Sequence, residues 1–305
     1  MNDTTYNLSI IIPHYNSPDS LKILLESIGF HKDVEVIVVD DKSTVEWKNI
    51  IAEFPNVCFL ENESSKKGPG VARNIGLDKA SGQWVLFADS DDILVDGWYT
   101  VVAECFSSEN EIVFFPPDSV DIKTGNKNTK RGRWYSSLCL NYIETGDDEL
   151  LRSKFSSPCS KLIKMSLINA YNLRFAEIMQ CEDSMFSAKS GYYAKSITAK
   201  SSPIYCINDH DGSLTTIVTE EAYRMRIDVL CEQYNFWEEK EGYEKSLEIL
   251  KRDGLNFIFS RRQFGIKYLI HEFNYIRKGG ISISYFRLLK FFGKKLIRKL
   301  LNVRK

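Results

Sequence analysis

The sequence predicts a mixed α/β fold in which a mainly parallel central sheet is flanked by helices and followed by a helical C-terminal extension. Short β-branched runs such as residues 8–12 are apolar at every position, which is typical of strands that are covered on both faces. Helix-length segments separate these runs, as the crossover connections between parallel strands require. From residue 220 onward the sequence shows helical patterns only.

Strands and helices are expected to alternate from residue 8 to residue 115. Each expected strand is a short apolar run, and each expected helix repeats its apolar residues at helical spacing. The predicted strands are residues 8–12, 34–39, 57–60, 84–88 and 111–115, and the predicted helices are residues 21–28, 45–54 and 71–80.

A polar stretch at residues 116–133, rich in Lys, Asn and Gly, predicts a loop insertion. Beyond it we expect helices at 147–154, 166–171 and 183–190, and short strands at 197–199 and 203–207. We place a domain boundary after residue 219, so that residues 1–219 form one domain and residues 220–305 form the helical extension.

Composition indicates a soluble globular protein, because 43% of its 305 residues are apolar and 27% are charged. The net charge of −1 hides a basic end: residues 261–305 hold 13 Lys or Arg and one acidic residue, Glu272. Residues 281–305 predict a basic amphipathic helix, which suits an anionic membrane surface or nucleic acid. Packing on the protein body or pairing with a second subunit is the structural alternative.

Seven scattered cysteines without a CxxC pair indicate reduced thiols in the cytosol. The N-terminal residues lack the basic flank of a signal peptide, and no apolar run approaches the length of a membrane span. We therefore expect a cytoplasmic protein that is held at the inner face of the cell membrane by its basic C-terminal helix.

Three predicted strands end in polar residues, and ligands of open parallel sheets bind at such ends. Each polar strand end alone is explained equally well by a turn, but three ends at one edge indicate a site. Asp89 and Asp91 can grip one Mg²⁺ or Mn²⁺, because residues two apart on an extended chain point the same way. Lys67, in a glycine-containing segment that leads into a helix, suits a phosphate.

Five segments carry a family resemblance by their order and spacing. They are SIIIPHYNSPDSLKILLESI, EVIVVDDKST, KGPGVARNIGLDKASGQWVLFADSDDIL, SPCSKLIKMSLI and QCEDSMF. With these segments the sequence resembles the inverting glycosyltransferases of family two, which have the GT-A fold. The resemblance covers residues 8 to 215 and implies a nucleotide-sugar donor, usually a UDP-sugar, a divalent metal ion, and transfer of one sugar with inversion.

The resemblance also implies how the donor is held. Pro13 and Tyr15 would line the base pocket, and Asp41 would accept a hydrogen bond from the uracil ring. Asp40 would support Asp41. Arg73 matches the arginine that helps to fix the nucleotide.

For the chemistry, the resemblance makes Asp91 the direct metal ligand, with Asp89 beside it facing ribose or water. Asp183 matches the catalytic base, and Glu182 would accept hydrogen bonds from sugar hydroxyls. A helix N-terminus weakens a base by favouring its ionised form, so we expect partial burial of Asp183 to compensate. A helix cap with a first-turn acid is the structural alternative for this pair.

Three further positions carry weaker expectations. His210 lies where related enzymes carry a residue that closes over the diphosphate, and a packed surface histidine is the alternative. Lys161 matches a lysine that orients acceptor or phosphate, although a structural lysine fits almost as well. Trp134 can stack on an acceptor sugar, but core packing is the default for aromatic residues.

We therefore expect a nucleotide-sugar-binding catalytic domain at residues 1–219 that adds one hexose or N-acetylhexosamine to a glycan, lipid-linked, in cell-surface polysaccharide synthesis. The QxxRW motif of processive synthases is missing, and Lys42 replaces the usual glycine after the paired aspartates. A sugar nucleotidyltransferase would need a glycine-rich loop after the first strand. A carbohydrate-binding or nucleic-acid-binding module leaves the acidic strand ends unexplained.

Overall fold

The chain divides into two compact units, residues 1–219 and 220–305. The computed structural model describes residues 6–210, 219–242, 246, 274–275 and 278. Helix α9 (Glu220–Glu241) belongs to the second unit, and the predicted basic helix at 281–305 lies outside the described residues. Among the described helices, none combines the length and apolar composition needed to cross a bilayer. All seven cysteines are free thiols.

The first unit is built on a seven-stranded sheet with the order β3-β2-β1-β4-β8-β6-β9. Neighbouring strands are parallel except at β8, which runs antiparallel to both β4 and β6. Every residue of β1 is buried, as the continuous apolar run predicts for a strand covered on both faces. The predicted mainly parallel α/β sheet is confirmed. The strands are β1 (Leu8–His14), β2 (Val34–Asp40), β3 (Val57–Glu61), β4 (Trp84–Phe87), β6 (Ile112–Phe114), β8 (Lys161–Lys164) and β9 (Ile197–Ala199).

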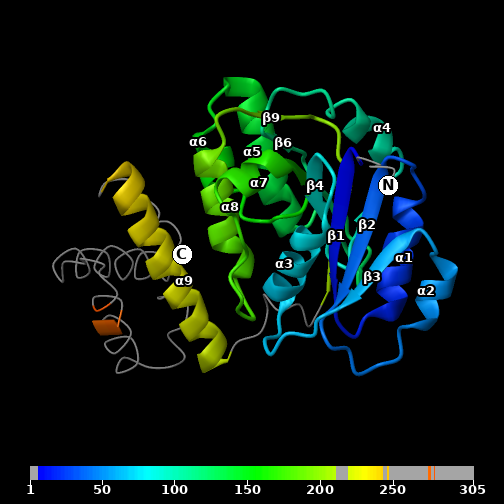
Figure 1. Ribbon diagram of the computed structural model, residues 1–305. Helices are drawn as coiled ribbons and strands as arrows, with labels where there is room; N and C mark the ends of the chain where they lie inside the picture. The colour runs from blue at the N-terminus through cyan, green and yellow to red at the C-terminus, as the bar shows by residue number, and fades with distance from the viewer. Residues whose placement is uncertain (1–5, 211–218, 243–245, 247–273, 276–277, 279–305) are drawn as a thin grey trace, which may run out of the picture. The chain divides into compact units, whose positions relative to one another are not determined.

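Helices flank this sheet (Figure 1). Helix α3 packs on β1 and β2, and it approaches closely because a Cβ at Gly76 would lie 2.4 Å from Ile11 Cγ2. Helix α7 packs on β8, and α8 packs on α6. The helices of this unit are α1 (Pro18–Ile28), α2 (Asn49–Glu53), α3 (Pro69–Lys79), α4 (Trp98–Ala103), α5 (Lys130–Thr145), α6 (Glu149–Lys154), α7 (Met165–Ala170) and α8 (Glu182–Tyr193).

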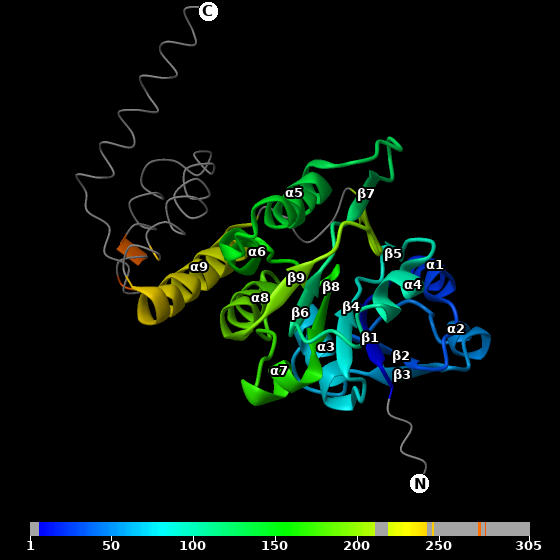
Figure 2. The same cartoon turned by 90° about the horizontal axis from the view of Figure 1, so that it is seen from above.

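The predicted loop at residues 116–133 is wrong in part. It contains strand β7 (Asp118–Asp121) and the first residues of α5. Strand β7 pairs with β10 (Tyr205–Asp209), which also pairs with β5 (Ile93–Leu94), so the three form a second, small sheet (Figure 2). The apolar runs in β5 and β7 are too short to predict a strand from the sequence. Each of these strands forms only by pairing with β10, which is distant in the sequence.

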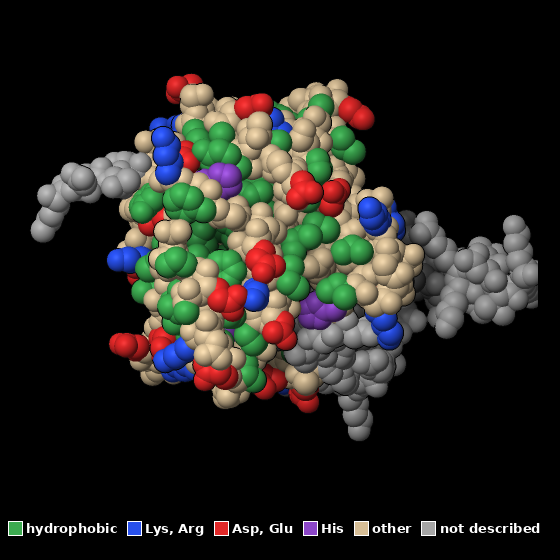
Figure 3. Space-filling model, turned by 90° about the vertical axis from the view of Figure 1, so that its right-hand side faces the viewer, with side chains coloured by type: hydrophobic (Ala, Val, Ile, Leu, Met, Phe, Trp, Pro, Cys, Tyr) green, Lys and Arg blue, Asp and Glu red, His purple; other side chains and the backbone are tan. Residues whose placement is uncertain are grey.

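Acidic, basic and apolar side chains are interspersed on the face that Figure 3 shows. Nucleic-acid-binding surfaces typically gather Lys and Arg on one face. This face therefore does not resemble one.

Strand β10 fixes the loop that follows β4. The Tyr205 hydroxyl donates to Asp92 Oδ2 at 2.6 Å and accepts from the Asp89 backbone N–H at 2.9 Å. The Asn208 backbone N–H donates to Asp92 Oδ1 at 2.7 Å, and the Asn208 side chain donates to the Asp91 carbonyl at 2.8 Å. Since Asp92 and Tyr205 are almost fully buried, these bonds hold the loop in one conformation.

We expect Tyr205→Phe to lower the free energy of unfolding by about 1–3 kcal/mol, because it leaves buried Asp92 and the Asp89 N–H with one partner fewer. Tyr99→Phe is the matched control, since the Tyr99 hydroxyl donates to Asp33 Oδ1 at 2.8 Å in a position that water still reaches. Urea denaturation measures both. Equal losses in the two variants would contradict the buttressing role of Tyr205.

Candidate active site

The candidate site lies at the carboxyl ends of β2, β1 and β4, which are neighbours in the sheet. Because these strands are parallel, the segments that follow them emerge at one edge. The structure therefore brings the predicted residues 13–15, 40–41 and 89–92 to a common edge. It adds Lys67 and Arg73 from the start of α3, and Asp183 from the first turn of α8.

His14 and Asp40 join the ends of β1 and β2 through a buried hydrogen bond between their side chains. His14 Nδ1 lies 2.9 Å from Asp40 Oδ1, and the Ser17 backbone N–H donates to His14 Nε2 at 3.3 Å. Nε2 must then be the unprotonated nitrogen, so Nδ1–H donates to Asp40. Burial lowers the pKa of His14 and keeps the ring neutral, although Asp40 opposes this. Asp40 also accepts from the Ser43 N–H at 3.0 Å, so it acts as a support.

Asp41 is buried, 4% exposed, next to the start of α3. Its two carboxylate oxygens accept from Asn62 Nδ2 at 2.6 Å and from the Gly68 backbone N–H at 2.7 Å. Burial raises the pKa of Asp41, whereas the two hydrogen bonds and Lys67 lower it. Each carboxylate oxygen has a second lone pair, so Asp41 can still accept a bond from a ligand.

Tyr15 and Lys67 lie together beside Asp41. The Lys67 ammonium lies 3.6 Å from the centre of the Tyr15 ring, which is within the range of a cation–π contact. Tyr15 is 45% exposed, so part of its side chain is accessible at this edge. Pro13 is buried within β1.

The loop after β4 gathers three carboxylates. One ligand atom from each of Asp89, Asp91 and Asp92 lies within 4.8 Å of the others. Both oxygens of Asp92 already accept internal hydrogen bonds, so Asp92 supports the loop. Asp89 and Asp91 each use one oxygen, toward Arg73 and His210, and keep the other for a ligand. His210 Nε2 lies 2.8 Å from Asp91 Oδ2 and can contribute a nitrogen ligand. This set of hard oxygen donors with one imidazole fits Mn²⁺ or Mg²⁺.

Arg73 joins the acidic loop to α8. Its guanidinium donates to Asp89 Oδ1 at 2.6 Å and to Glu182 Oε1 at 2.7 Å. Arg73 is 4% exposed and Glu182 is 8% exposed. We expected Arg73 to fix the nucleotide and Glu182 to face sugar hydroxyls; the structure shows a buried ion pair between them.

Asp183 follows Glu182 in the first turn of α8. Burial raises the pKa of Asp183 to about 7; Glu182 and Asp89 add to the rise, and Arg73 and Arg131 oppose it. We expected partial burial of Asp183 to offset the effect of the helix N-terminus, and burial is the largest cause of its raised pKa. A carboxyl group with a pKa near 7 can accept a proton at neutral pH.

Lys161 begins β8 beside the carboxyl end of β4, and its side chain is buried, as the structural alternative for this lysine requires. It is 1% exposed, and its ammonium donates to the Phe155 carbonyl at 3.2 Å and to Ser187 Oγ at 3.1 Å. Burial lowers the pKa of Lys161 to about 7. In this position Lys161 ties β8 to α8 inside the core.

Arg131 is a residue that our sequence reasoning missed. It lies in the first turn of α5, where its charge acts on both Asp89 and Asp183. Trp134, on the same helix, is 50% exposed, as a stacking role for it would require. The Lys and Arg content of residues 130–133 was the available signal, but the segment was expected to be a loop.

Comparison with known proteins places the chain in a family. Residues 9–171 match the family model described as "Glycosyl transferase family 2". A poly(ribitol-phosphate) beta-glucosyltransferase of Bacillus spizizenii is 30% identical over 243 residues, which are 73% of this chain and 36% of that protein. A GalNAc(5)-diNAcBac-PP-undecaprenol beta-1,3-glucosyltransferase of Campylobacter jejuni is 29% identical over 73% of this chain and 72% of that protein.

Solved structures agree on the fold. S. aureus TarS, residues 1–349, in complex with UDP-GlcNAc, aligns with a TM-score of 0.60 and 23% identity, covering 75% of this chain and 66% of that one. A second crystal structure of S. aureus TarS 1–349 aligns with a TM-score of 0.58 and 23% identity, covering 75% of this chain and 65% of that one. The match over residues 9–171 covers more than half of the sequence, and the chain belongs to glycosyltransferase family 2.

Proposed function

We propose that this protein is an inverting, non-processive glycosyltransferase that moves one sugar from a nucleotide-sugar to a glycan acceptor. The observation that carries the proposal is the Arg73 bridge, because it places a carboxylate loop suited to a metal ion beside a carboxyl group suited to accept a proton. Glycosyl transfer needs both, since charge builds on the leaving phosphate while the acceptor hydroxyl loses a proton.

We propose a UDP-hexose or UDP-N-acetylhexosamine as the donor. Asp41 has acceptor capacity for the uracil N–H, Tyr15 is partly exposed beside it, and Lys67 supplies a cation near the start of α3. The TarS structure described in complex with UDP-GlcNAc supports this donor class.

Asp91, Asp89 and His210 would hold a divalent metal ion. Such an ion would supply positive charge to the leaving diphosphate. Asp92 and Tyr205 orient the loop for this task, and Arg73 offsets the charge of Asp89.

Asp183 acts as the base in a single displacement. The acceptor hydroxyl gives its proton to the Asp183 carboxylate as its oxygen bonds to the anomeric carbon. The bond from that carbon to the diphosphate oxygen breaks, and its electron pair leaves with the UDP. Attack from the face opposite the leaving group inverts the anomeric carbon.

The acceptor that we propose is a cell-surface glycan in lipid-linked form, as the name of the Campylobacter relative describes for that enzyme. A position at the cytoplasmic face of the membrane remains a prediction from the basic residues 281–305. The alternatives of a sugar nucleotidyltransferase or a carbohydrate-binding module gain no support, since the family match is to glycosyltransferases.

We expect Asp91→Ala to weaken Mn²⁺-dependent binding of UDP by about 10²-fold or more, because the loop loses its most exposed carboxylate. Titration calorimetry with UDP and Mn²⁺ measures the effect. Asp96→Ala, which removes an exposed carboxylate outside the cluster, should bind as the wild type does. Full affinity in Asp91→Ala would exclude Asp91 as a ligand.

Asp183→Asn should lower turnover by about 10²–10⁴-fold, the usual contribution of a general base. UDP binding should stay close to that of the wild type, because Asp183 does not lie on the donor side. The assay follows UDP release from a panel of UDP-sugars with Mn²⁺ and a glycan-lipid extract. Turnover near the wild-type rate would remove Asp183 from the mechanism.

The raised pKa of Asp183 also predicts a pH-dependent stability. Because its pKa rises from 3.8 to about 7 on folding, the wild type loses stability through this group as pH rises across that range. The amide side chain of the variant stays neutral, so Asp183→Asn should gain stability relative to the wild type from pH 4 to pH 7, with no further gain above. Urea unfolding in EDTA measures this. A difference independent of pH would show that Asp183 ionises normally.

A further inference from the structure

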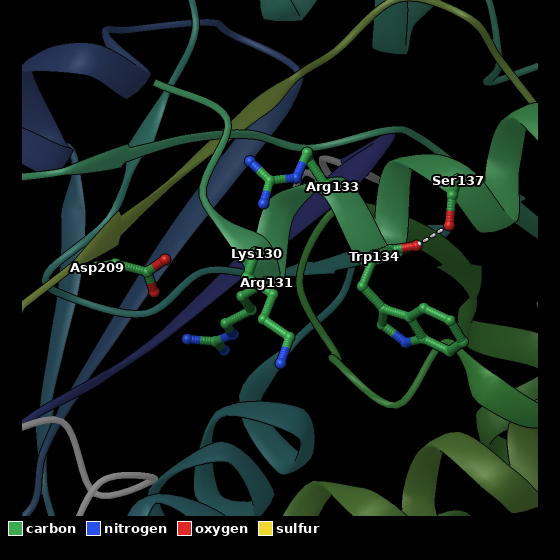
Figure 4. A pocket seen from close by; sticks show the side chains of 6 residues that line it. All are labelled: Lys130, Arg131, Arg133, Trp134, Ser137 and Asp209. Carbon is green, nitrogen blue, oxygen red and sulfur yellow. Dashed lines mark hydrogen bonds between the residues drawn. The ribbon is translucent and has the colours of Figure 1, made fainter. Parts of the chain in front are cut away.

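A pocket at the start of α5 lies beside the candidate site without belonging to its donor side. It measures about 670 Å³, which is within the range of small-ligand sites. Figure 4 shows its lining: Lys130, Arg131, Arg133, Trp134, Ser137 and Asp209. The side chains of Lys130, Arg131 and Trp134 extend together from the helix, and Arg133 lines the pocket from the opposite side.

The pocket is basic. Three cations line it against one carboxylate, Asp209. The side chains of Lys130 and Arg131 make no hydrogen bond or ion pair with any residue that the structure describes. Arg133 donates to the Asn128 carbonyl and has no carboxylate partner in the described ranges. Among the described residues, these three cations therefore have no carboxylate partner that would explain their position.

The position of these cations on α5 is unfavourable without an anion. All three lie in the first turn of the helix, which begins at Lys130. The backbone dipole gives this end of a helix partial positive charge, so Lys and Arg here repel it. An anionic ligand in the pocket would relieve that repulsion and would also meet three donors.

The other lining groups suit a sugar. The Trp134 ring is 50% exposed and gives a flat apolar face on which a pyranose or polyol chain can lie. Asp209 and the Ser137 hydroxyl can bond to sugar hydroxyls. The pocket therefore combines anion recognition with carbohydrate recognition.

Two lining residues of the pocket lie near the candidate base and the acidic loop. Arg131 is close enough to Asp183 to lower its pKa, and Asp209 directly precedes His210, which contacts Asp91. The donor-side groups come from the ends of β1 and β2, whereas α5 packs on β9, at the opposite edge of the seven-stranded sheet, and on β7 of the small sheet. A ligand in the pocket would therefore reach Asp183 from the side opposite the nucleotide.

We propose that this pocket binds the acceptor, and that the acceptor is a glycan carrying anionic groups, phosphate or carboxylate, next to the sugar that is modified. The inference rests on the proposed function for its link to transfer, but the binding itself is independent of the donor. Lys130, Arg131 and Arg133 hold the anion, and Trp134 holds the neighbouring sugar.

The test uses the full chain without donor or metal and three probes: a glycerol-phosphate hexamer, a hyaluronan hexasaccharide and maltohexaose. We expect the wild type to bind at least one anionic probe more tightly than maltohexaose, with an affinity that falls as NaCl rises. The anionic probe that binds identifies the group as phosphate or carboxylate. The double variant Lys130→Gln/Arg133→Gln should lose about tenfold in affinity for that probe, because two charged donors are lost.

The matched control is Lys32→Gln/Lys79→Gln, which removes two charges near the amino ends of β2 and β4 and should bind as the wild type does. Binding of neither anionic probe, equal binding of maltohexaose, or full affinity in the Lys130/Arg133 variant would overturn the proposal. An equal loss of UDP and Mn²⁺ binding in that variant would assign the pocket to the donor instead. A wild type that binds an anionic probe but no UDP would contradict the proposed function and leave the acceptor pocket standing.

Discussion

The ion pairs of Arg73 with Asp89 and Glu182 are the interaction on which the rest of the site depends. They join residues 109 positions apart, one from α3 and one from α8, to the loop after β4. Buried carboxylates are strongly unfavourable unless a cation and hydrogen bonds compensate them. Without the guanidinium, Asp89 and Glu182 would lie as like charges beside Asp183. The acidic edge is tolerable in the folded chain because Arg73 is inside it.

Close backbone packing makes this position of Arg73 possible. A Cβ at Gly70 would lie 2.1 Å from the Ala176 carbonyl oxygen, so the start of α3 can approach the segment before α8 only with glycine there. Gly76 allows the same helix to lie on Ile11 of β1. The two glycines let α3 pack closely on β1 and on the segment before α8, and Arg73 on this helix contacts both Asp89 and Glu182. The electrostatics of the site thus follow from packing.

The sequence predicts the parts of the site that are local and fails where partners are distant. Asp40, Asp41, Asp89 and Asp91 follow continuous apolar strands, and parallel strand ends share an edge, so their grouping could be predicted. The roles of Arg73 and Glu182 as each other's partners could not, since nothing local marks a pair separated by 109 residues. The burial of Lys161 could not be predicted, because lysine side chains are usually exposed and only the packing of β8 against α8 buries this one. Arg131 was missed for a related reason. Strand β7 forms by pairing with the distant β10, and the segment expected to be a loop therefore contains β7 and the start of α5, where Arg131 lies.

Burial sets the direction of the pKa shift of Asp183, and the charges around this carboxyl group act on it in both directions. Glu182 and Asp89 raise the pKa, whereas Arg73 and Arg131 lower it, and burial is the largest single cause. A cation bound near Asp89 would reduce the repulsion from that carboxylate, and an anion bound near Arg131 would weaken the opposing attraction. These two changes act in opposite directions on the same carboxyl group. With both ligands bound the two effects on the pKa of Asp183 would oppose each other, whereas each ligand alone would shift it in one direction. The pairing of an acidic loop on one side of Asp183 with a basic helix start on the other therefore has a chemical consequence beyond binding.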